Sequence, residues 1–189
     1  RIGYVLFYQF DNFIDNPLYI FEIWKGGMSF HGGLIGIIFS IYFFSKKNNI
    51  NFFYLSDLVS IVAPIGIFFG RIANFINNEL YGRVTDFPFA MIYPLVDMQP
   101  RHPSQLYEAF FEGFIIFMIL IIYFYKKKNN IIFGKISCYF LFCYSIFRFT
   151  IEFLRQPDYQ IGLIFNIFSM GQLLCIPLLV IGIIIYKKL

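Results

Sequence analysis

The chain has 189 residues, of which 59% are hydrophobic, 23% aromatic and only 14% charged. Soluble globular proteins average about 45–50% apolar and about 25% charged residues, so this composition excludes an ordinary soluble domain and predicts contact with lipid. The net charge of +4 does not indicate a nucleic-acid partner, because the lysines stand in short clusters at the ends of apolar segments and form no continuous basic face.

The first 27 residues do not form a complete predicted span. Residues 2–10 are apolar, which favours the end of a truncated span, and residues 11–24 are aromatic and acidic, as is typical of a membrane interface. The chain begins with Arg1 and shows no signal-peptide pattern, so we expect it to be a fragment of a longer protein.

Five apolar stretches are long enough, or nearly so, to cross a hydrocarbon core that needs about 20 helical residues. Backbone groups in lipid must be satisfied within the segment, so each stretch predicts a helix. The expected fold is therefore an all-α polytopic membrane protein with about five transmembrane helices, a small periplasmic cap of outward-facing loops, and one transmembrane domain over residues 1–189. The predicted spans are residues 28–44, 55–75, 104–125, 134–153 and 167–186.

The distribution of Lys between these spans predicts their orientation, since translocated loops are depleted in basic residues. Lysines concentrate in three alternate connections, after residue 44, between residues 125 and 136, and after residue 186. These ends are expected to be cytoplasmic. The loops at 11–27, 76–103 and 154–166 are then expected to face outward.

Two arginines, Arg71 and Arg148, lie inside predicted spans near their outward ends. A charge in the membrane interior costs at least about 2.5–3.5 kcal/mol, so such residues usually face a polar cavity and mark a functional site. The alternative is a structural ion pair, for instance between Arg148 and Glu152 one helical turn away.

The segment GRIANFINNELYGR at 70–83 predicts a polar helix face where lipid would require apolar residues. Amide, guanidinium and carboxylate groups can together hold a lipid headgroup, with Arg offering forked donors to phosphate oxygens. The alternative is a hydrogen-bond network that only joins helices. The expected face contains Arg71, Asn74, Asn77 and Asn78, and Glu79 and Gly82 follow it.

Two histidines are predicted near the outward side. His31 begins the run HGGLIG, whose glycines allow close approach of another backbone, and histidine can take a proton from a thiol near neutral pH. The alternative is a polar anchor at the interface. His102 stands in RHPSQLYE, where Ser104 is expected to cap a helix and Glu108 requires a partner such as an intramembrane arginine.

The cysteines Cys138, Cys143 and Cys175 lie in apolar runs and are expected to be small buried residues. They are too far apart for a close metal-binding pair, and no other His, Cys or carboxylate set has ligand spacing. No metal and no cofactor are therefore expected.

Five segments together resemble the prolipoprotein diacylglyceryl transferase family, over essentially the whole chain and in the family's order. The chain departs from the family pattern at Ala73, where a glycine is usual, and in a short loop between Arg83 and Arg101. Family members carry additional amino-terminal spans. A functional tyrosine of the family lies in those spans and matches no residue of this sequence. The segments are GGMSFHGGLIG (26–36), GRIANFINNELYGR (70–83), RHPSQLYE (101–108), FRFTIEFLRQPD (147–158) and SMGQ (169–172).

The resemblance implies an enzyme of the bacterial inner membrane that moves a diacylglyceryl group from phosphatidylglycerol to the lipobox cysteine of a prolipoprotein signal peptide. It implies that Arg71 and Arg148 hold the phosphate and that His31 receives the thiol proton. The remaining implied site residues are Asn74, Asn77, Glu79 and Gly82 around the headgroup, Glu108 and Glu152 orienting the arginines, and His102 as an assistant.

Two other functions stay open from sequence. A transporter would also place charge among glycine-rich helices, but it predicts internal symmetry, and the sequences around Arg71 and Arg148 do not align with each other. A non-catalytic phospholipid-binding membrane protein with the same fold is the second alternative.

Overall fold

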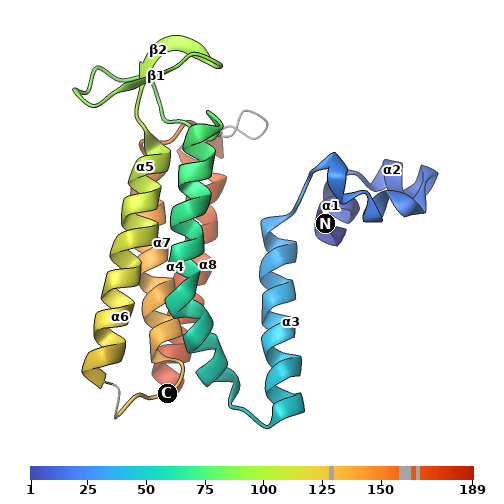
Figure 1. Ribbon diagram of the computed structural model, residues 1–189, viewed down its shortest axis with the longest axis vertical. Coiled ribbons are helices and arrows are strands. Elements are labelled where there is room, and N and C mark those ends of the chain that lie inside the picture. The colour runs from blue at the N-terminus through green and yellow to red at the C-terminus, as the bar shows by residue number, and fades with distance from the viewer. Residues whose placement is uncertain (128–129, 158–162, 165–166) are drawn as a thin grey trace. The chain divides into compact units, whose positions relative to one another are not determined.

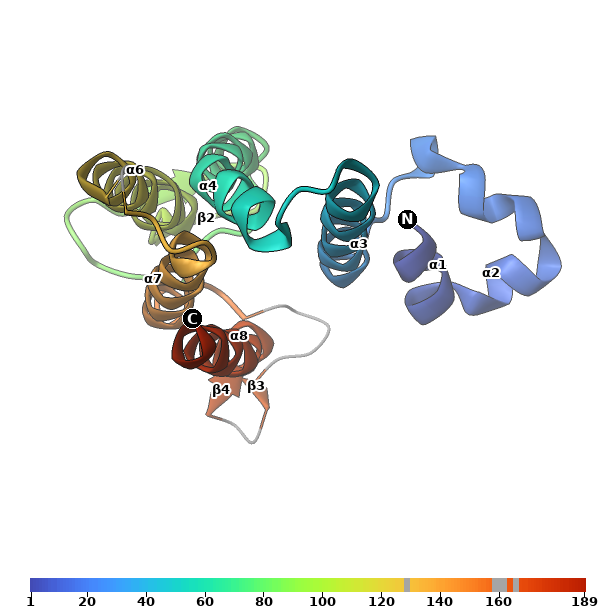
Figure 2. The same ribbon diagram turned by 90° about the horizontal axis from the view of Figure 1, so that it is seen from below.

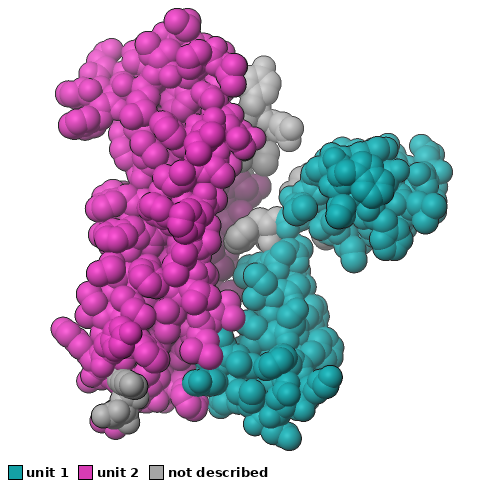
Figure 3. Space-filling model, in the orientation of Figure 1, with its two compact units in different colours: residues 1–55 teal, residues 56–189 magenta. Residues whose placement is uncertain are grey.

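The computed structural model describes residues 1–127, 130–157, 163–164 and 167–189. Within these ranges the side chains of Phe7, Tyr8, Phe30, His31, Leu163 and Ile164 are outside the description. The chain forms two compact units, residues 1–55 and residues 56–189, which are coloured separately in Figure 3. A single transmembrane domain over the whole chain stays a prediction.

The first unit consists of short helices followed by one long helix. Helix α3 begins after Ser29, whose hydroxyl accepts a hydrogen bond from the Gly32 amide at 3.3 Å, and it ends where Asn49 adopts a left-handed conformation with φ 54°. Gly3 lies against Gly32, because a Cβ built on Gly3 would stand 3.3 Å from the Gly32 Cα. The close approach predicted for this glycine run is thus present at Gly32. The elements are α1 (Ile2–Tyr8), α2 (Phe10–Asp15), η1 (Pro17–Phe21), η2 (Ile23–Lys25) and α3 (Phe30–Asn48).

The second unit contains most of α4 and three further long helical segments that lie side by side (Figures 1 and 2). The segment from residue 104 to residue 127 is one continuous helix with a π-helical stretch, η3, inside it. Helix α7 packs against α8 and against α6. All five predicted spans are therefore helical. The elements are α4 (Phe52–Ile76), α5 (Ser104–Glu108), η3 (Ala109–Ile115), α6 (Ile116–Lys127), α7 (Lys135–Ile151) and α8 (Met170–Lys188).

A β-hairpin connects α4 with α5 at one end of this helix bundle (Figure 1). Strands β1 (Met91–Tyr93) and β2 (Asp97–Arg101) pair antiparallel, and a second short pair forms from β3 (Leu163–Ile164) and β4 (Phe168–Ser169). We call this end of the second unit the hairpin end, and the opposite end, with Lys126 and Lys187, the lysine end. A small cap is thus present, while the side of the membrane that it faces stays a prediction.

Three helical segments, Phe52–Ile76, Ser104–Lys127 and Met170–Lys188, are long and apolar enough to cross a membrane. Within their most apolar windows only 22%, 33% and 17% of residues are buried, so most of their surface is available to lipid. Helix α7 has 17 residues, and neither it nor α3 belongs to this group. The chain is a helical membrane protein, and the number of five spans stays a prediction.

A buried carboxylate on α4 caps the start of α7 at the lysine end. Asp57 is only 4% exposed, and its oxygens accept hydrogen bonds from the amides of Gly134 and Ser137 at 2.7 and 2.8 Å and from the Ser137 hydroxyl at 2.7 Å. Ser56 and Ser60 also contact the Ser137 hydroxyl, at 2.8 and 3.3 Å. A negative group at a helix N-terminus satisfies free amides and complements the helix dipole. We call this group of residues the Asp57 cluster.

A small apolar core lies beside the Asp57 cluster. Ile61 of α4, Ile116 and Leu120 of the 104–127 helix, and Ile136 of α7 are buried together there. This core joins three helices in one half of the second unit. The polar residues in the other half are therefore held by helices that are already packed together.

Candidate functional site

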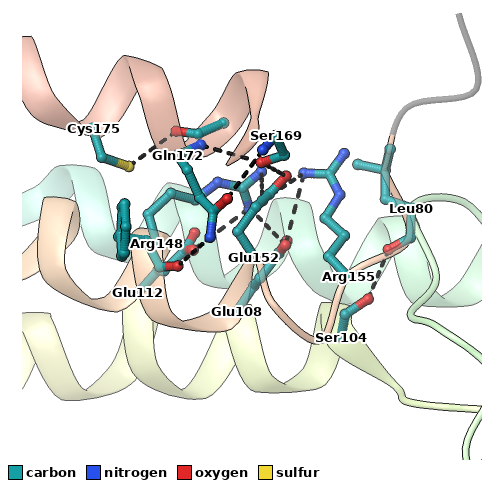
Figure 4. Close-up of polar contacts among 12 residues, drawn as sticks. Leu80, Ser104, Glu108, Glu112, Arg148, Glu152, Arg155, Ser169, Gln172 and Cys175 are labelled. Atoms are coloured by element: carbon teal, nitrogen blue, oxygen red, sulfur yellow. Dashed lines mark hydrogen bonds and ion pairs between the residues drawn. The ribbon is translucent and has the colours of Figure 1, made fainter. Parts of the chain in front are cut away.

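A buried group of charged side chains occupies the hairpin half of the second unit (Figure 4). Its members come from α4, α5, η3, α7 and the turn that follows α7. The three arginine side chains are at most 18% exposed and the three glutamate side chains at most 6%. The group, called here the arginine–glutamate cluster, consists of Arg71, Glu108, Glu112, Arg148, Glu152 and Arg155.

Glu108 joins the two arginines that the sequence singled out. Its Oε2 lies 2.9 Å from Nε of Arg71, and its Oε1 lies 2.6 Å from Nη1 of Arg148. The expectation that Glu108 has an arginine partner is confirmed, and the contact with Glu108 brings the two arginines together. The contact with Arg148 is a hydrogen bond between charged groups, which is of the strong kind, and the contact with Arg71 is a close ion pair.

Glu152 holds the other side of Arg148. Nη2 of Arg148 is 2.8 Å from Oε2 of Glu152, four residues later in the chain, which confirms the predicted pair. The Ser169 hydroxyl donates to Oε1 of Glu152 at 2.9 Å, and Ser169 also forms a capping box with Gln172 at the start of α8. A Cβ on Gly171 would stand 2.9 Å from the same oxygen. Glu152 therefore sits against the N-terminus of α8, which favours a negative charge.

Two members of the cluster were not predicted as site residues. Glu112 is fully buried in η3, and its oxygens lie 3.6 Å from Nη2 of Arg71 and 3.6 Å from Nη1 of Arg148. Arg155 places Nη1 3.8 Å from Oε1 of Glu108. The sequence held a signal for Glu112, because a glutamate four residues after Glu108 lies on the same face of the helix.

The cluster is electrically balanced, since its three guanidinium groups and three carboxylates give a formal charge of +3 − 3 = 0. Buried ion pairs often gain little net stability, because desolvation offsets their attraction. Removing one partner leaves a buried unpaired charge and costs about 3–5 kcal/mol. Concentrated buried charge of this kind is more typical of a functional site than of a stabilising device.

A glycine brings α4 close enough for Arg71 to reach the other helices. A Cβ on Gly113 would stand 2.8 Å from the Phe68 Cα and 3.0 Å from its backbone nitrogen, so η3 packs directly on the α4 backbone. Phe68 lies three residues before Arg71 on α4. This contact therefore sets the separation across which Arg71 meets Glu108 and Glu112.

The predicted polar helix face is only partly helical. Helix α4 ends at Ile76, and Asn78 adopts φ 57°, a left-handed conformation that ends helices and that Asn tolerates well. The expectation that Asn78 continues the helix face beside Arg71 is therefore wrong, whereas the Asn77 amide directly after α4 still donates to the Ala73 carbonyl at 2.9 Å. Asn74 lies in α4 and donates to Oε2 of Glu79 at 3.0 Å, while Asn77 and Glu79 are exposed.

Gly82 lies in a backbone junction between three chain segments. Its amide donates to the His102 carbonyl at 2.9 Å, and the Arg83 amide donates to the Leu154 carbonyl at 2.9 Å. A Cβ on Gly82 would stand 2.8 Å from that Leu154 oxygen. The described contacts of Gly82 are thus structural, and they tie the ends of α4, α5 and α7 together.

The other residues of the RHPSQLYE segment pack beside the cluster. Nδ1 of His102 is 3.5 Å from the Tyr107 hydroxyl, and its ring centroid lies 5.8 Å from that of Phe87. The prediction that Ser104 caps α5 is wrong, because Pro103 is the N-cap residue and the Ser104 hydroxyl donates to the Leu80 carbonyl at 2.9 Å. Ser104 fastens the loop after α4 to the start of α5.

His31 belongs to the first unit. Its backbone lies in α3, and its side chain is outside the described residues. The expectation that His31 receives a proton therefore stays a prediction.

Hydrogen bonds fasten the hairpin to the helix ends. The Tyr93 hydroxyl donates to Oε1 of Gln105 at 3.0 Å, and Nε2 of Gln105 donates to the Glu79 carbonyl at 2.6 Å. Burial raises the pKa of Tyr93 to about 12. Nη2 of Arg101 lies 2.6 Å from Oδ2 of Asp97, and this hydrogen bond lowers the pKa of the Asp97 carboxyl below its usual range.

The three cysteines lie outside the ion pairs of the cluster. Cys138 and Cys175 are buried and Cys143 is partly buried, and all three are free thiols. Burial of Cys138 and Cys175 confirms the expectation for these two residues. Among the residues that the structure describes, no group of three His, Cys, Asp or Glu side chains is placed to hold a metal ion.

Comparison with known families decides the relationship of this chain. The model of the family described as prolipoprotein diacylglyceryl transferase matches residues 1–187. The chain belongs to this family. Every cluster residue except Glu112 lies in one of the segments that carry the resemblance to the diacylglyceryl transferases.

Individual transferases of the family are also similar to the chain. Phosphatidylglycerol–prolipoprotein diacylglyceryl transferase of Aeromonas salmonicida is 52% identical over 182 residues, which are 96% of this chain and 65% of that protein. The transferase of Aliivibrio fischeri is 50% identical over 184 residues, 97% of this chain and 65% of that protein. That of Rickettsia felis is 50% identical over 96% of this chain and 70% of its own length. The chain thus spans 65% of the length of the first two relatives.

Proposed function

We propose that this protein transfers the diacylglyceryl group of phosphatidylglycerol to the thiol of a prolipoprotein's lipobox cysteine and releases glycerol phosphate. The names of the relatives support the reaction. The observation that carries the proposal is that Arg71 and Arg148 are both bound to Glu108 within an apolar helix bundle. Such a pair of oriented guanidinium groups suits a phosphate that must be held away from water.

The reaction forms a C–S bond and breaks the C–O bond between the glyceryl carbon and the phosphate oxygen. The sulfur supplies the electron pair and loses its proton, and the phosphate departs with the electrons of the broken bond. Negative charge therefore grows on the phosphate in the transition state. Donors that are oriented in advance stabilise such charge by about 3–4 kcal/mol each, because they need not reorganise during the reaction. Arg71 and Arg148 are assigned this role.

Glu108 and Glu152 act as positioning residues in this proposal. Each contacts Arg148 within 2.8 Å, and Glu108 also contacts Arg71, so together they fix the directions of the forked donors. A carboxylate that holds an arginine in place limits the cost of ordering that side chain when the lipid binds.

The remaining assignments concern the headgroup and the thiol. Asn74 and Glu79 are hydrogen-bonded at the end of α4, one turn beyond Arg71, which supports a place for them beside the glycerol of the headgroup. His31 is proposed to take the thiol proton. Asn77, Gly82 and His102 are proposed to shape the entry to the headgroup site, Gly82 through the backbone junction that it permits.

The proposed location is the inner membrane of a bacterium, with the cluster toward the outer leaflet. The lysines at the other end of the helices support this orientation, because cytoplasmic loops are enriched in basic residues. Both proposed substrates are anchored in the membrane. Lateral entry of phosphatidylglycerol and of the signal peptide from the lipid phase is therefore part of the proposal.

Transfer of label from lipid to peptide tests this function. The protein is reconstituted in vesicles containing phosphatidylglycerol with labelled acyl chains, and the label in a lipobox peptide is followed. Arg148→Lys and Arg71→Lys keep the positive charge but lose the planar guanidinium with its paired N–H donors. We therefore expect each to lower the transfer rate about 10²–10³-fold.

Arg101→Lys is the matched control, because Arg101 pairs with Asp97 in the hairpin and not with the cluster. This variant should stay within about twofold of the unchanged protein, as expected for a partly exposed ion pair. Equal rates for Arg148→Lys and the unchanged protein would remove the assigned role. Label that never reaches the peptide, although phosphatidylglycerol still binds, would favour a lipid-binding protein without catalysis.

A further inference from the structure

Glu112 is the least firmly held carboxylate of the arginine–glutamate cluster. Glu108 and Glu152 each have guanidinium nitrogens within 2.9 Å, whereas the nitrogens nearest to Glu112 are 3.6 Å away. Within the described part of the chain, neither oxygen of Glu112 accepts a hydrogen bond, although the residue is fully buried. Buried polar atoms are normally satisfied, so two such oxygens on one side chain require an explanation.

The backbone around Glu112 is also unusual. Residues Ala109–Ile115 form the π-helical segment η3 in a helix that is otherwise α-helical. A π-helical turn costs regular hydrogen bonding and occurs frequently at functional sites. Glu112 lies in this segment, one turn after Glu108, and faces Arg71 and Arg148.

The groups that face Glu112 come from every neighbouring helix. Arg71 approaches from α4 and Arg148 from α7, each at 3.6 Å. Glu108 precedes it by one turn on its own helix, and Arg155 acts on it from the turn after α7. Tyr144 of α7 and Cys175 of α8 are close enough to interact with it electrostatically.

Charge balance links Glu112 to a bound phosphate. The cluster is neutral when all six groups are ionised, so a phosphodiester with one negative charge would leave a net charge of −1 in a buried site. An uncompensated buried charge costs several kcal/mol. Uptake of one proton by a carboxylate restores neutrality, and the carboxylate with the fewest contacts loses least by binding it.

We propose that Glu112 binds one proton from solvent when the phosphate of phosphatidylglycerol enters the cluster, and releases it when the phosphate product leaves. The inference rests on the proposed function, because it takes a phospholipid headgroup as the ligand. Protonation turns Glu112 from an acceptor into a donor toward the phosphate, while Glu108 and Glu152 keep Arg71 and Arg148 in place. Glu112 is thus a substrate-binding residue that couples headgroup binding to the uptake of a proton.

Calorimetric titration with dihexanoyl phosphatidylglycerol, kept below its micelle-forming concentration, measures this coupling. Repeating the titration in buffers with different heats of ionisation gives the number of protons taken up. We expect about one proton for the unchanged protein, and an affinity that falls about tenfold per pH unit where free Glu112 is ionised. Glu112→Gln should bind with no proton uptake and with an affinity independent of pH.

Two matched variants identify the residue. Glu108→Gln changes a carboxylate with close arginine partners, and Asp97→Asn changes one outside the cluster, so the Asp97→Asn protein should still take up one proton. Loss of proton uptake in Glu108→Gln and not in Glu112→Gln would overturn the assignment.

The proton count of the unchanged protein tests the proposal even if a variant does not fold. Binding without any proton uptake by that protein would overturn the role of Glu112 and leave the proposed transfer reaction intact. Failure of the protein to bind the lipid at all would contradict the proposed function itself.

Discussion

Helices α4 and α7 are joined by buried polar groups at both ends, and the two junctions differ in chemistry. At the lysine end, the single carboxylate of Asp57 accepts three hydrogen bonds from neutral donors at 2.7–2.8 Å. At the hairpin end, about 21 Å further along α4 by helical rise, three carboxylates meet three guanidinium groups. There, both oxygens of Glu112 lack a hydrogen bond among the described residues.

The difference separates a structural junction from a site built for a ligand. Fully satisfied buried polar groups fix a unique packing, whereas partly satisfied ones cost stability. Proteins retain such costly groups where function requires them. We therefore assign the Asp57 cluster to the register of α4 against α7, and the arginine–glutamate cluster to substrate.

The first prediction concerns stability at the lysine end and has the largest expected effect. Asp57→Ala removes all three acceptor contacts and leaves the buried amides of Gly134 and Ser137 unpaired, so the free energy of unfolding should fall by about 3 kcal/mol. Unfolding of the purified protein in detergent, followed by circular dichroism, measures this loss. A loss no greater than that of an exposed-site substitution would place the structural junction elsewhere.

The second prediction concerns the close contact between η3 and α4. Gly113→Ala forces a methyl group against the Phe68 backbone, which should cost about 1–3 kcal/mol of stability and move Arg71 away from Glu108. The transfer rate per folded molecule should fall more than tenfold, since small misplacements of binding groups are costly. Gly66→Ala is the control, because a Cβ on this α4 glycine meets no other atom within 4 Å. Equal effects of the two changes would show that the contact does not position Arg71.

The third prediction compares neutral substitutions at the two ends directly. Asp57→Asn should lower the free energy of unfolding by about 1–2 kcal/mol, because charge-assisted hydrogen bonds are lost. With saturating phosphatidylglycerol, Glu112→Gln should change it by no more than about 0.5 kcal/mol, because the bound phosphate together with Glu108 and Glu152 then balances the three guanidinium groups. The two variants are compared in parallel unfolding experiments. A larger loss for Glu112→Gln would reverse the comparison.

The fourth prediction concerns the hairpin and has the smallest effect. The hydrogen bond from Arg101 lowers the pKa of Asp97, so this carboxyl stabilises the folded hairpin above its ordinary pKa of about 4. The contribution is lost as the pH falls through the lowered pKa. Hydrogen exchange at the Gln99 amide, which donates to Asp97, reports opening of the hairpin. On acidification this opening should become more frequent as Asp97 is protonated. In Asp97→Asn that extra acid dependence should be absent, and its persistence would implicate another group.

The helical segments and the central ion pairs could be predicted from sequence, for physical reasons. Long apolar runs require helices in lipid, and Arg71, Glu108 and Arg148 are charges that lipid would not tolerate unpaired. Because an unpaired charge in lipid is costly, contacts among these three side chains could be expected from sequence. The pair of Arg148 with Glu152 followed from helical spacing.

The remaining features depend on local backbone geometry and on tertiary contacts. The end of α4 before Asn77 depends on the left-handed conformation of Asn78, which a polar helix pattern does not reveal. Ser104 could be a cap from its position alone, yet Pro103 precedes the helix and the hydroxyl bonds to Leu80. Glu112 shares a helix face with Glu108 by its spacing of four residues, but its contacts with Arg71 and Arg148 depend on how three helices pack.

The capping of α7 by Asp57 has a consequence for synthesis of the protein. The donors to this carboxylate lie 77 and 80 residues later in the chain. Ribosomes add about 5–20 residues per second, so about 4–16 s pass between translation of the acceptor and of its donors. During that interval the Asp57 carboxylate has none of the amides that it binds in the folded protein. The contact that sets the register of α4 against α7 therefore forms only after the start of α7 has been translated.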